Sequence, residues 1–277
     1  MIEVKNLTKN YGKIRAVDDI SFVVNKGDVF GLLGPNGAGK TTIIKMLTTL
    51  SRPDSGKCII GGLEIDKNLL EIKRQIGIVP QENNLDRELT AYENLFIYGM
   101  LYEVNNLKKR IRDTLETVGL WERRDSLVSN FSGGMQRRLL LSRALLTEPT
   151  VIFLDEPSIG LDPQIRQQMW EIIRRTKLEG RTVIITTHYI EEAEALCDRV
   201  GILTKGKLIA LDRPAKLKAT IGEYVVERVN EKGKLLQRIF KSRYEAYQFA
   251  MASEVPLTIR KSNLEDVFIM LTGERIE

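Results

Sequence analysis

The sequence predicts an α/β fold: a mostly parallel sheet that carries a helical insertion, followed by a small α+β region at the end of the chain. Two observations support this prediction. Short apolar runs of strand length alternate with helical patterns, as expected for parallel strands that are buried on both faces. Between about residues 85 and 146 the strand patterns stop and helical patterns follow one another, which indicates an insertion into the sheet.

The N-terminal part of the chain is expected to consist mainly of strands. Residues 29–33, VFGLL, form a compact apolar run that is typical of a strand buried on both faces. A helix is expected to follow at about 39–50, and residues 52–56, RPDSG, have the composition of a turn. The strands expected in this part lie at 2–7, 14–24, 29–33, 57–60 and 76–80.

Helix signals fill the middle of the chain. Thr90 and Glu93 have the spacing of a capping box, in which two side chains bond to each other's backbone at a helix start. Residues 107–118 have an amphipathic, basic helical pattern, and a further helix is expected at 135–146, ending before Pro149.

Strands and helices alternate again after the insertion. Buried strands are expected at 151–154 and 182–187. Between them, Asp162 and Pro163 have the residue types that open a helix, which should extend to Gly180. This return to alternation favours a single sheet interrupted by the helical segment.

The pattern changes again after about Gly222. Two strand-like segments flank an Asn-Glu-Lys-Gly turn and indicate a hairpin. We therefore expect a main domain at 1–220, with its helical insertion at about 85–146, and an α+β accessory domain at 221–277. The elements expected in the accessory domain are strands at 224–229 and 235–240, a helix at 242–253, an extended segment at 257–260 and a helix at 263–271.

Composition limits the class of protein without naming a function. The chain has 277 residues, a net charge of +5 and a sequence pI of about 9.1, which is too mild to predict nucleic-acid or membrane binding. It has no apolar run of the roughly 18–20 residues needed to span a bilayer, and its alternating N-terminus is unlike a signal peptide. We therefore expect a cytoplasmic protein.

The strongest motif is GPNGAGKT at residues 34–41, which matches G-x-x-x-x-G-K-[ST] between an expected strand and an expected helix. This context predicts a P-loop NTPase core, because glycines let backbone N–H groups surround phosphates at a helix N-terminus. Lys40 should reach the β- and γ-phosphates of ATP, and Thr41 should bind Mg²⁺. The expected phosphate-binding residues are Gly34, Pro35, Asn36, Gly37, Ala38, Gly39, Lys40, Thr41 and Thr42.

A second motif places two carboxylates at the end of an apolar strand, VIFLDE at 151–156. Burying two carboxylates there is costly unless they hold a cation or a reactant at the edge of the sheet. We expect Asp155 to bind Mg²⁺ through water and Glu156 to orient and deprotonate an attacking water. Alone the motif is weak, and the glycine-rich loop (residues 34–42) makes it specific.

A third motif, FSGGMQRR at 131–138, places Ser132, Gly133 and Gly134 at an expected helix start, which would form a second anion-binding site. A flexible helix-entry turn is the alternative. One chain has no evident use for two phosphate-binding helix ends, whereas two chains arranged head to tail do.

Taken together, these motifs resemble the ATP-binding subunit of an ABC transporter over residues 1 to about 220. The resemblance implies an antiparallel β subdomain beside the P-loop core, and it implies that residues 132–134 are the family signature. Tyr11 resembles the aromatic residue that stacks on adenine; an exposed tyrosine without a role is the alternative. Gln81 resembles the glutamine that senses Mg²⁺ and relays to the membrane subunit, the alternative being a polar loop residue.

Two further positions gain roles from the resemblance. His188, the only histidine of the chain, resembles the switch histidine that bonds to the γ-phosphate and helps to hold Glu156. On its own it would be a histidine at a strand end. Asp162 resembles a residue of the loop that crosses between the two sites, and it also fits a helix N-cap. The chain departs from the signature at Phe131 and Met135, where the family has leucine and glutamine, so altered contacts are expected from position 135.

The end of the chain refines the resemblance. Residues 263–268, NLEDVF, and 271–273, LTG, resemble the ending of exporter ATPases of the daunorubicin-resistance branch, although an amphipathic helix docking on the core is the alternative. This implies an ATPase on the inner face of the cell membrane that works through separate transmembrane permease subunits. A head-to-tail homodimer is expected, with a heterodimer also open, and no nucleic acid. The alternative function is a soluble ABC ATPase acting on nucleic acid or ribosomes.

Overall fold

The computed structural model describes residues 1–230, 233–253 and 255–273. Its centre is a six-stranded sheet in the order β10-β9-β3-β8-β7-β6. Every neighbouring pair is parallel except β9 and β10, so the prediction of a mostly parallel sheet is confirmed. Its strands are β3 (Val29–Leu33), β6 (Ile76–Val79), β7 (Val151–Asp155), β8 (Thr182–Thr187), β9 (Arg199–Thr204) and β10 (Lys207–Asp212).

The side chains of the central strands alternate between two hydrophobic cores. Phe30 and Phe153 point to one core, together with the first helix and the N-terminal sheet. The adjacent residues Val29 and Leu154 point to the other core, which the helical segment covers. Because both faces of the sheet are covered, β3, β7 and β8 are buried along their whole length, which explains their continuous apolar runs.

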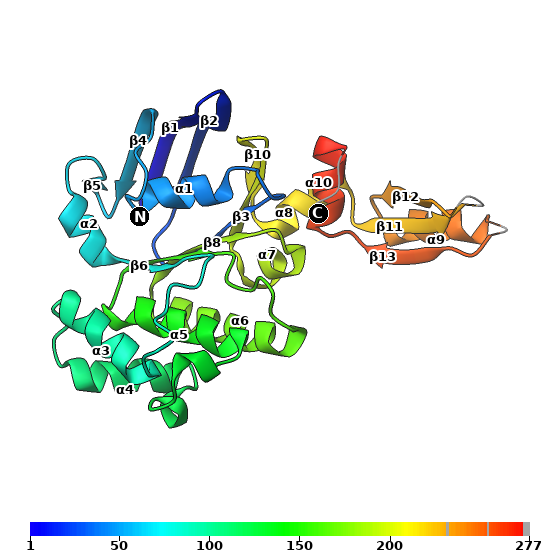
Figure 1. The fold of residues 1–277 in the computed structure, drawn as a ribbon. Coiled ribbons are helices and arrows are strands. Elements are labelled where there is room, and N and C mark those ends of the chain that lie inside the picture. Colours follow the sequence, from blue (N-terminus) through cyan, green and yellow to red (C-terminus); the bar gives the residue numbers. More distant parts are fainter. Residues whose placement is uncertain (231–232, 254, 274–277) are drawn as a thin grey trace.

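A second, antiparallel sheet in the order β2-β1-β4-β5 lies at the upper left of the molecule in Figure 1. β1 continues to Tyr11, beyond its predicted end at residue 7, because it pairs with two neighbours through several register shifts. Helix α1 lies below this sheet in Figure 1. The elements of this part are β1 (Ile2–Tyr11), β2 (Ile14–Val24), α1 (Lys40–Leu47), β4 (Ser55–Ile60), β5 (Leu63–Glu64) and α2 (Leu69–Gln75).

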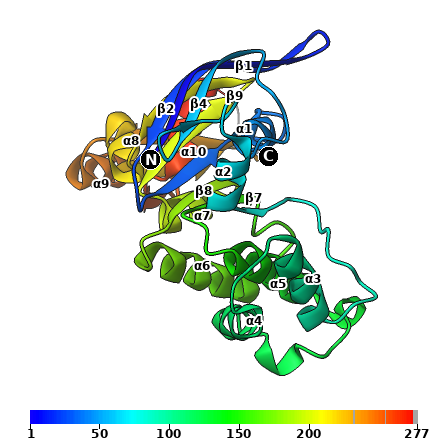
Figure 2. The same ribbon diagram turned by 90° about the vertical axis from the view of Figure 1, so that its left-hand side faces the viewer.

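The helical segment projects away from the sheet, as Figure 2 shows. It contains α3 (Ala91–Leu101), α4 (Leu107–Thr117) and α5 (Gly133–Leu146). The predicted capping box is present: Glu93 N donates to Thr90 Oγ1 at 3.1 Å, and Thr90 N donates to Glu93 Oε2 at 2.8 Å. After β7 the chain forms α6 (Pro163–Leu178), β8 and α7 (Ile190–Leu196).

The last part of the chain begins with α8 (Pro214–Ile221) and forms a three-stranded antiparallel sheet in the order β12-β11-β13. This sheet and α9 extend to one side of the molecule, and α10 stands next to α8 (Figure 1). Val267 and Phe268 of α10 belong to the same core as Leu217 of α8, so the last helix packs against the main part. The remaining elements are β11 (Tyr224–Val229), β12 (Leu235–Phe240), α9 (Arg243–Met251), β13 (Thr258–Lys261) and α10 (Leu264–Thr272).

The division of the chain at residue 220 stays a prediction. Between residues 190 and 221 the structure contains α7, β9, β10 and α8, for which the sequence analysis assigned no elements. Within the described ranges, none of the helices combines the length and the apolar character that a membrane crossing requires.

Candidate functional site

The glycine-rich loop leads from the carboxyl end of β3 into the N-terminus of α1. Two of its glycines are required by their surroundings. A Cβ on Gly34 would lie 2.3 Å from the carbonyl oxygen of Leu203, and a Cβ on Gly39, whose φ is +102°, would lie 2.4 Å from that of Ala16. The loop is therefore held close to two other backbone segments. It lines a cavity of about 290 Å³, together with Ala16, Gln81 and Glu156.

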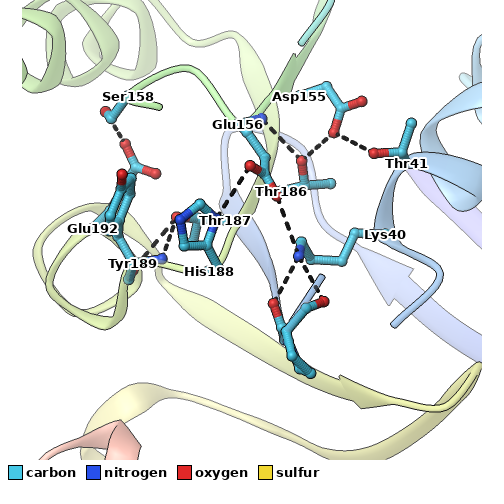
Figure 3. Close-up of polar contacts among 12 residues, drawn as sticks. Lys40, Thr41, Asp155, Glu156, Ser158, Thr186, Thr187, His188, Tyr189 and Glu192 are labelled. Atoms are coloured by element: carbon cyan, nitrogen blue, oxygen red, sulfur yellow. Dashed lines mark hydrogen bonds and ion pairs between the residues drawn. The ribbon is translucent and has the colours of Figure 1, made fainter. Parts of the chain in front are cut away.

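Lys40 lies at the base of this cavity with only 4% of its surface exposed. Its Nζ donates to the carbonyl oxygens of Gly34 at 2.7 Å and Pro35 at 3.0 Å, and lies 3.3 Å from Glu156 Oε1 (Figure 3). Burial lowers the pKa of Lys40, while the carboxylates of Glu156 and Asp155 oppose that shift. The ammonium is thus desolvated and held in place, ready to meet an anion that enters the loop.

Asp155 ends β7 with its carboxylate next to the start of α1. Its Oδ1 accepts hydrogen bonds from Thr41 Oγ1 at 3.2 Å and from Thr186 Oγ1. Burial raises the pKa of Asp155, and these two hydrogen bonds counteract that shift. A hydroxyl and a carboxylate oxygen therefore converge at the mouth of the loop, which fits the oxygen ligands that Mg²⁺ prefers.

Glu156 has an unusual backbone conformation, with φ at +49°, which is disfavoured for a residue with a Cβ. Its N–H donates to both the carbonyl and the hydroxyl of Thr186, at 3.1 and 3.0 Å. The turn directs the carboxylate between Lys40 and His188, as Figure 3 shows. Sequence reasoning missed Thr186, although two hydroxyl residues at the end of a buried strand next to β7 were a usable signal.

His188 follows β8 and faces the same carboxylate, with Nδ1 3.1 Å from Glu156 Oε2. Neither atom has a well-aligned hydrogen bond among the described residues, and both are buried. Its ring lies against that of Tyr189, at a centroid distance of 4.2 Å. The structure therefore brings His188, Glu156, Lys40 and Asp155 together near the carboxyl ends of neighbouring parallel strands.

The Ser-Gly-Gly segment (residues 132–134) lies apart from this cavity. Ser132 is the N-cap of α5, and its Oγ accepts a hydrogen bond from Met135 N at 3.3 Å. Ser132 and Gly133 are exposed. Gly134 is buried, and a Cβ there would lie 2.5 Å from the side chain of Ile165. Within one chain the two predicted anion sites do not share a cavity.

The remaining predicted residues differ in whether they reach the cavity. Gln81 lines the cavity. Tyr11 is 48% exposed at the end of β1, with Lys9 Nζ 5.6 Å from its ring centroid, and it does not line the cavity. Asp162 has the alternative role that the sequence left open, since it is the N-cap of α6 and its Oδ1 accepts from Ile165 N at 2.9 Å.

Comparisons with known proteins agree on one family. The family model described as ABC transporter matches residues 17–159. The chain is 38% identical to the linearmycin resistance ATP-binding protein LnrL of Bacillus subtilis, over 100% of this chain and 99% of that protein. It is 40% identical to the Nod factor export ATP-binding protein I of Mesorhizobium japonicum, over 100% of this chain and 88% of that protein.

Solved structures give the same result for the fold. The ATP-binding subunit of an ABC transporter matches with a TM-score of 0.75 and 27% identity, over 98% of this chain and 99% of that one. An ATP-binding cassette solved as a dimer in a post-hydrolysis state with ADP and Pi matches with a TM-score of 0.70 and 26% identity, over 77% of this chain and 98% of that one.

Proposed function

Because this chain belongs to the ABC transporter family as an ATP-binding subunit, we propose that it hydrolyses ATP with Mg²⁺ as a head-to-tail dimer and drives export through separate transmembrane permease subunits. The observation that carries the proposal is the convergence of Lys40, Asp155, Glu156 and His188 on the cavity of the glycine-rich loop. Burying this many charged groups is costly, and such clusters in a cavity are typical of functional sites.

Nucleotide binding follows from the loop and its surroundings. The backbone N–H groups of residues 34–42 and the N-terminus of α1 would receive the phosphates. Lys40 would exchange its contacts with Glu156 and with the two carbonyl oxygens for contacts with the β- and γ-phosphates. Tyr11, which is exposed at the end of β1, is assigned to the adenine ring.

The hydroxyl of Thr41 and the carboxylate of Asp155 are assigned to Mg²⁺, together with Gln81, which lines the same cavity as Thr41. When bound, the ion neutralises charge on the β- and γ-phosphates. Thr186 keeps the Asp155 carboxylate oriented.

Glu156 is assigned as the base that takes a proton from the attacking water. Its backbone turn and the Thr186 contacts direct its carboxylate into the cavity. When Lys40 turns to the phosphates, Glu156 Oε1 loses its cation and becomes available to the water. His188, next to Oε2, would hold the carboxylate and donate to the γ-phosphate.

A second copy would complete each site. Ser132 and Gly133 are exposed at a helix N-terminus and face no phosphate-binding loop of their own chain. A two-fold, head-to-tail pair would set this helix end against the partner's glycine-rich loop, with Asp162 near the crossing between the two sites. Both half-sites are present in the chain, so a homodimer suffices and a heterodimer is compatible.

Export is proposed from the relatives, whose names describe resistance and export. The chain would act at the inner face of the membrane, bound to permease subunits that carry the cargo path.

Replacing Glu156 by Gln tests the proposal. We expect ATP turnover, measured by phosphate release, to fall by about 100-fold or more, because the amide is no base. ATP should still bind, and an ATP-bound dimer should accumulate in light scattering. Glu116→Gln, on the exposed face of α4, is the matched control and should keep parental turnover. Near-parental hydrolysis by Glu156→Gln would remove Glu156 from this role.

A further inference from the structure

Arg137, in the second turn of α5, is a buried arginine with 6% of its surface exposed. Its guanidinium hydrogen bonds all go to main-chain carbonyl oxygens rather than to carboxylates. Nε donates to Pro157 at 3.0 Å, Nη1 to Pro80 at 2.6 Å and Gln81 at 2.9 Å, and Nη2 to Asp155 at 2.9 Å and Glu156 at 2.6 Å. One side chain therefore connects α5, the helix that begins at the Ser-Gly-Gly segment, to the end of β7 and to the loop after β6.

The geometry of these bonds suits a guanidinium and no other side chain. Its planar fork has donors in fixed directions, and here it bonds to three consecutive carbonyls at 155–157 and two more at 80–81. Burial lowers the pKa of Arg137, while the nearby carboxylates of Asp155, Glu192 and Glu156 oppose that shift. Two of the carboxylates that favour the charge, those of Asp155 and Glu156, thus belong to residues whose carbonyl oxygens Arg137 holds.

The bonds to residues 155 and 156 act on the strained turn of the catalytic strand. Glu156 has a positive φ, which is disfavoured for a non-glycine residue and must be held by its surroundings. Thr186 holds the N–H of Glu156 from one side. Arg137 Nη2 holds the carbonyl oxygens of Glu156 and Asp155 from the other side. The direction of the Glu156 carboxylate depends on both.

The bonds to residues 80 and 81 act on the other edge of the cavity, where Gln81 lies. Neighbouring contacts strengthen this connection. Gln136 of the same helix accepts from Asn83 Nδ2, and its own Nε2 donates to the carbonyl oxygen of Phe131 at 2.9 Å. The first turns of α5 therefore hold the loop that carries Gln81 as well as the segment before Ser132.

We propose that Arg137 is a positioning residue that couples the exposed start of α5 to the settings of Glu156 and Gln81; this rests on the proposed function. When a second copy contacts residues 132–134, the first turns of α5 would move together and shift the Arg137 guanidinium. That shift would reach the carbonyls of the catalytic turn and of the Gln81 loop. The residue touches no reacting atom, and it acts through the backbone of those that do.

Two substitutions test this role. Arg137→Lys keeps the positive charge but loses the planar fork of donors. Arg137→Gln removes the positive charge, so that no cation is left buried without its hydrogen-bond partners. In both, we expect kcat for ATP to fall about 10- to 100-fold, as for a misplaced catalytic group, with KM changed by less than about threefold. Arg138→Lys is the matched control, because this neighbouring guanidinium donates only to the Val118 carbonyl among the contacts of the described residues, and it should keep parental kcat.

The outcomes separate this inference from the function on which it rests. Parental kcat in either folded variant overturns the coupling role, and a Lys variant with parental kcat would show that charge alone suffices. If neither variant folds, as judged by thermal unfolding, Arg137 is a stability element and the inference fails. If Glu156→Gln keeps its turnover in the parent chain, the proposed function itself fails, whatever the Arg137 variants do.

Discussion

The two halves of the proposed nucleotide site differ sharply within one chain. In the half built on the glycine-rich loop, Lys40, Asp155 and Glu156 are each only 4% exposed and are linked through Thr41, Thr186 and His188. In the half built on the start of α5, Ser132 and Gly133 are exposed, and the Ser132 side chain accepts a hydrogen bond from Met135 N of its own helix.

This difference indicates that the two halves become complete at different stages, one during folding and the other during dimerisation. Folding assembles the buried half, because neighbouring parallel strands bring their ends together and exclude water from the charges between them. Such preorganised charges can stabilise a transition state without rearrangement of solvent. In the proposed dimer a second molecule completes the exposed half, so the binding free energy of that half remains available for closing the dimer.

Removing the histidine from the buried half should have the largest effect of the three changes considered next. His188→Ala takes away the group next to Glu156 Oε2, so the carboxylate loses a contact. Under the proposed function, the γ-phosphate also loses a hydrogen-bond donor. We expect turnover to fall by about 100-fold, and nucleotide affinity, measured with a fluorescent ATP analogue, to stay within about threefold of the parent.

Tyr189→Phe is the control for this change, since it keeps the ring that packs against the imidazole and removes only a hydroxyl. If His188→Ala hydrolyses ATP at the parental rate, the histidine is a strand-end residue without a catalytic role, and the buried half of the site ends at Glu156.

An added side chain at the exposed half should act on dimerisation and leave the buried half unchanged. Ser132→Arg places a large cation at the helix end that would meet the partner chain. We expect ATP-dependent dimerisation, followed by light scattering in the Glu156→Gln background, to weaken by about 30-fold, or about 2 kcal/mol. ATP binding by the monomer should stay near parental.

The same substitution removes the N-cap of α5, which should lower stability by about 1 kcal/mol. Ser129→Arg, at an exposed position three residues earlier, adds the same side chain without that loss and should dimerise normally. Unchanged dimerisation by Ser132→Arg would disprove the head-to-tail arrangement.

The sequence predicted the strands that carry the buried half better than it predicted the later elements of the main domain. Strands such as β3 and β8 were placed correctly, because a run buried on both faces leaves a continuous apolar signal. The elements between residues 190 and 221 were missed. There, β9 and β10 have only the short apolar runs VGIL and LIAL, and runs of this length are shared by strands and buried helix segments.

The positions of site residues also followed from motifs, because each motif places a chemical group at a strand end or a helix start. The sequence analysis missed Thr186 and Arg137, whose roles depend on contacts that are distant in the sequence. Arg137 bonds to carbonyl oxygens of residues 18 to 57 positions away, and a carbonyl oxygen leaves no mark in a residue pattern. Thr186 bonds to the backbone N–H of Glu156 and to the carboxylate of Asp155, which lie 30 and 31 positions away. The resemblance to ABC transporter ATP-binding subunits was confirmed.

The smallest effect is expected at Met135, in the first turn of α5, where the chain departs from the family signature. Its side chain is half-buried and packs against the core, while its N–H bonds to Ser132 Oγ. Met135→Gln keeps that backbone bond and replaces a thioether by an amide of similar length. Turnover should therefore change by less than about tenfold, or about 1.4 kcal/mol.

Met251→Gln is the matched control, because it makes the same replacement at a side chain 87% exposed on α9 and should leave turnover unchanged. A total loss of turnover in Met135→Gln, or a gain of about 100-fold, would mean that position 135 sets the rate. In that case the exposed half would contribute to chemistry as well as to closure. A change within tenfold would mean that Ser132 and the glycine N–H groups, rather than residue 135, carry the role of the exposed half.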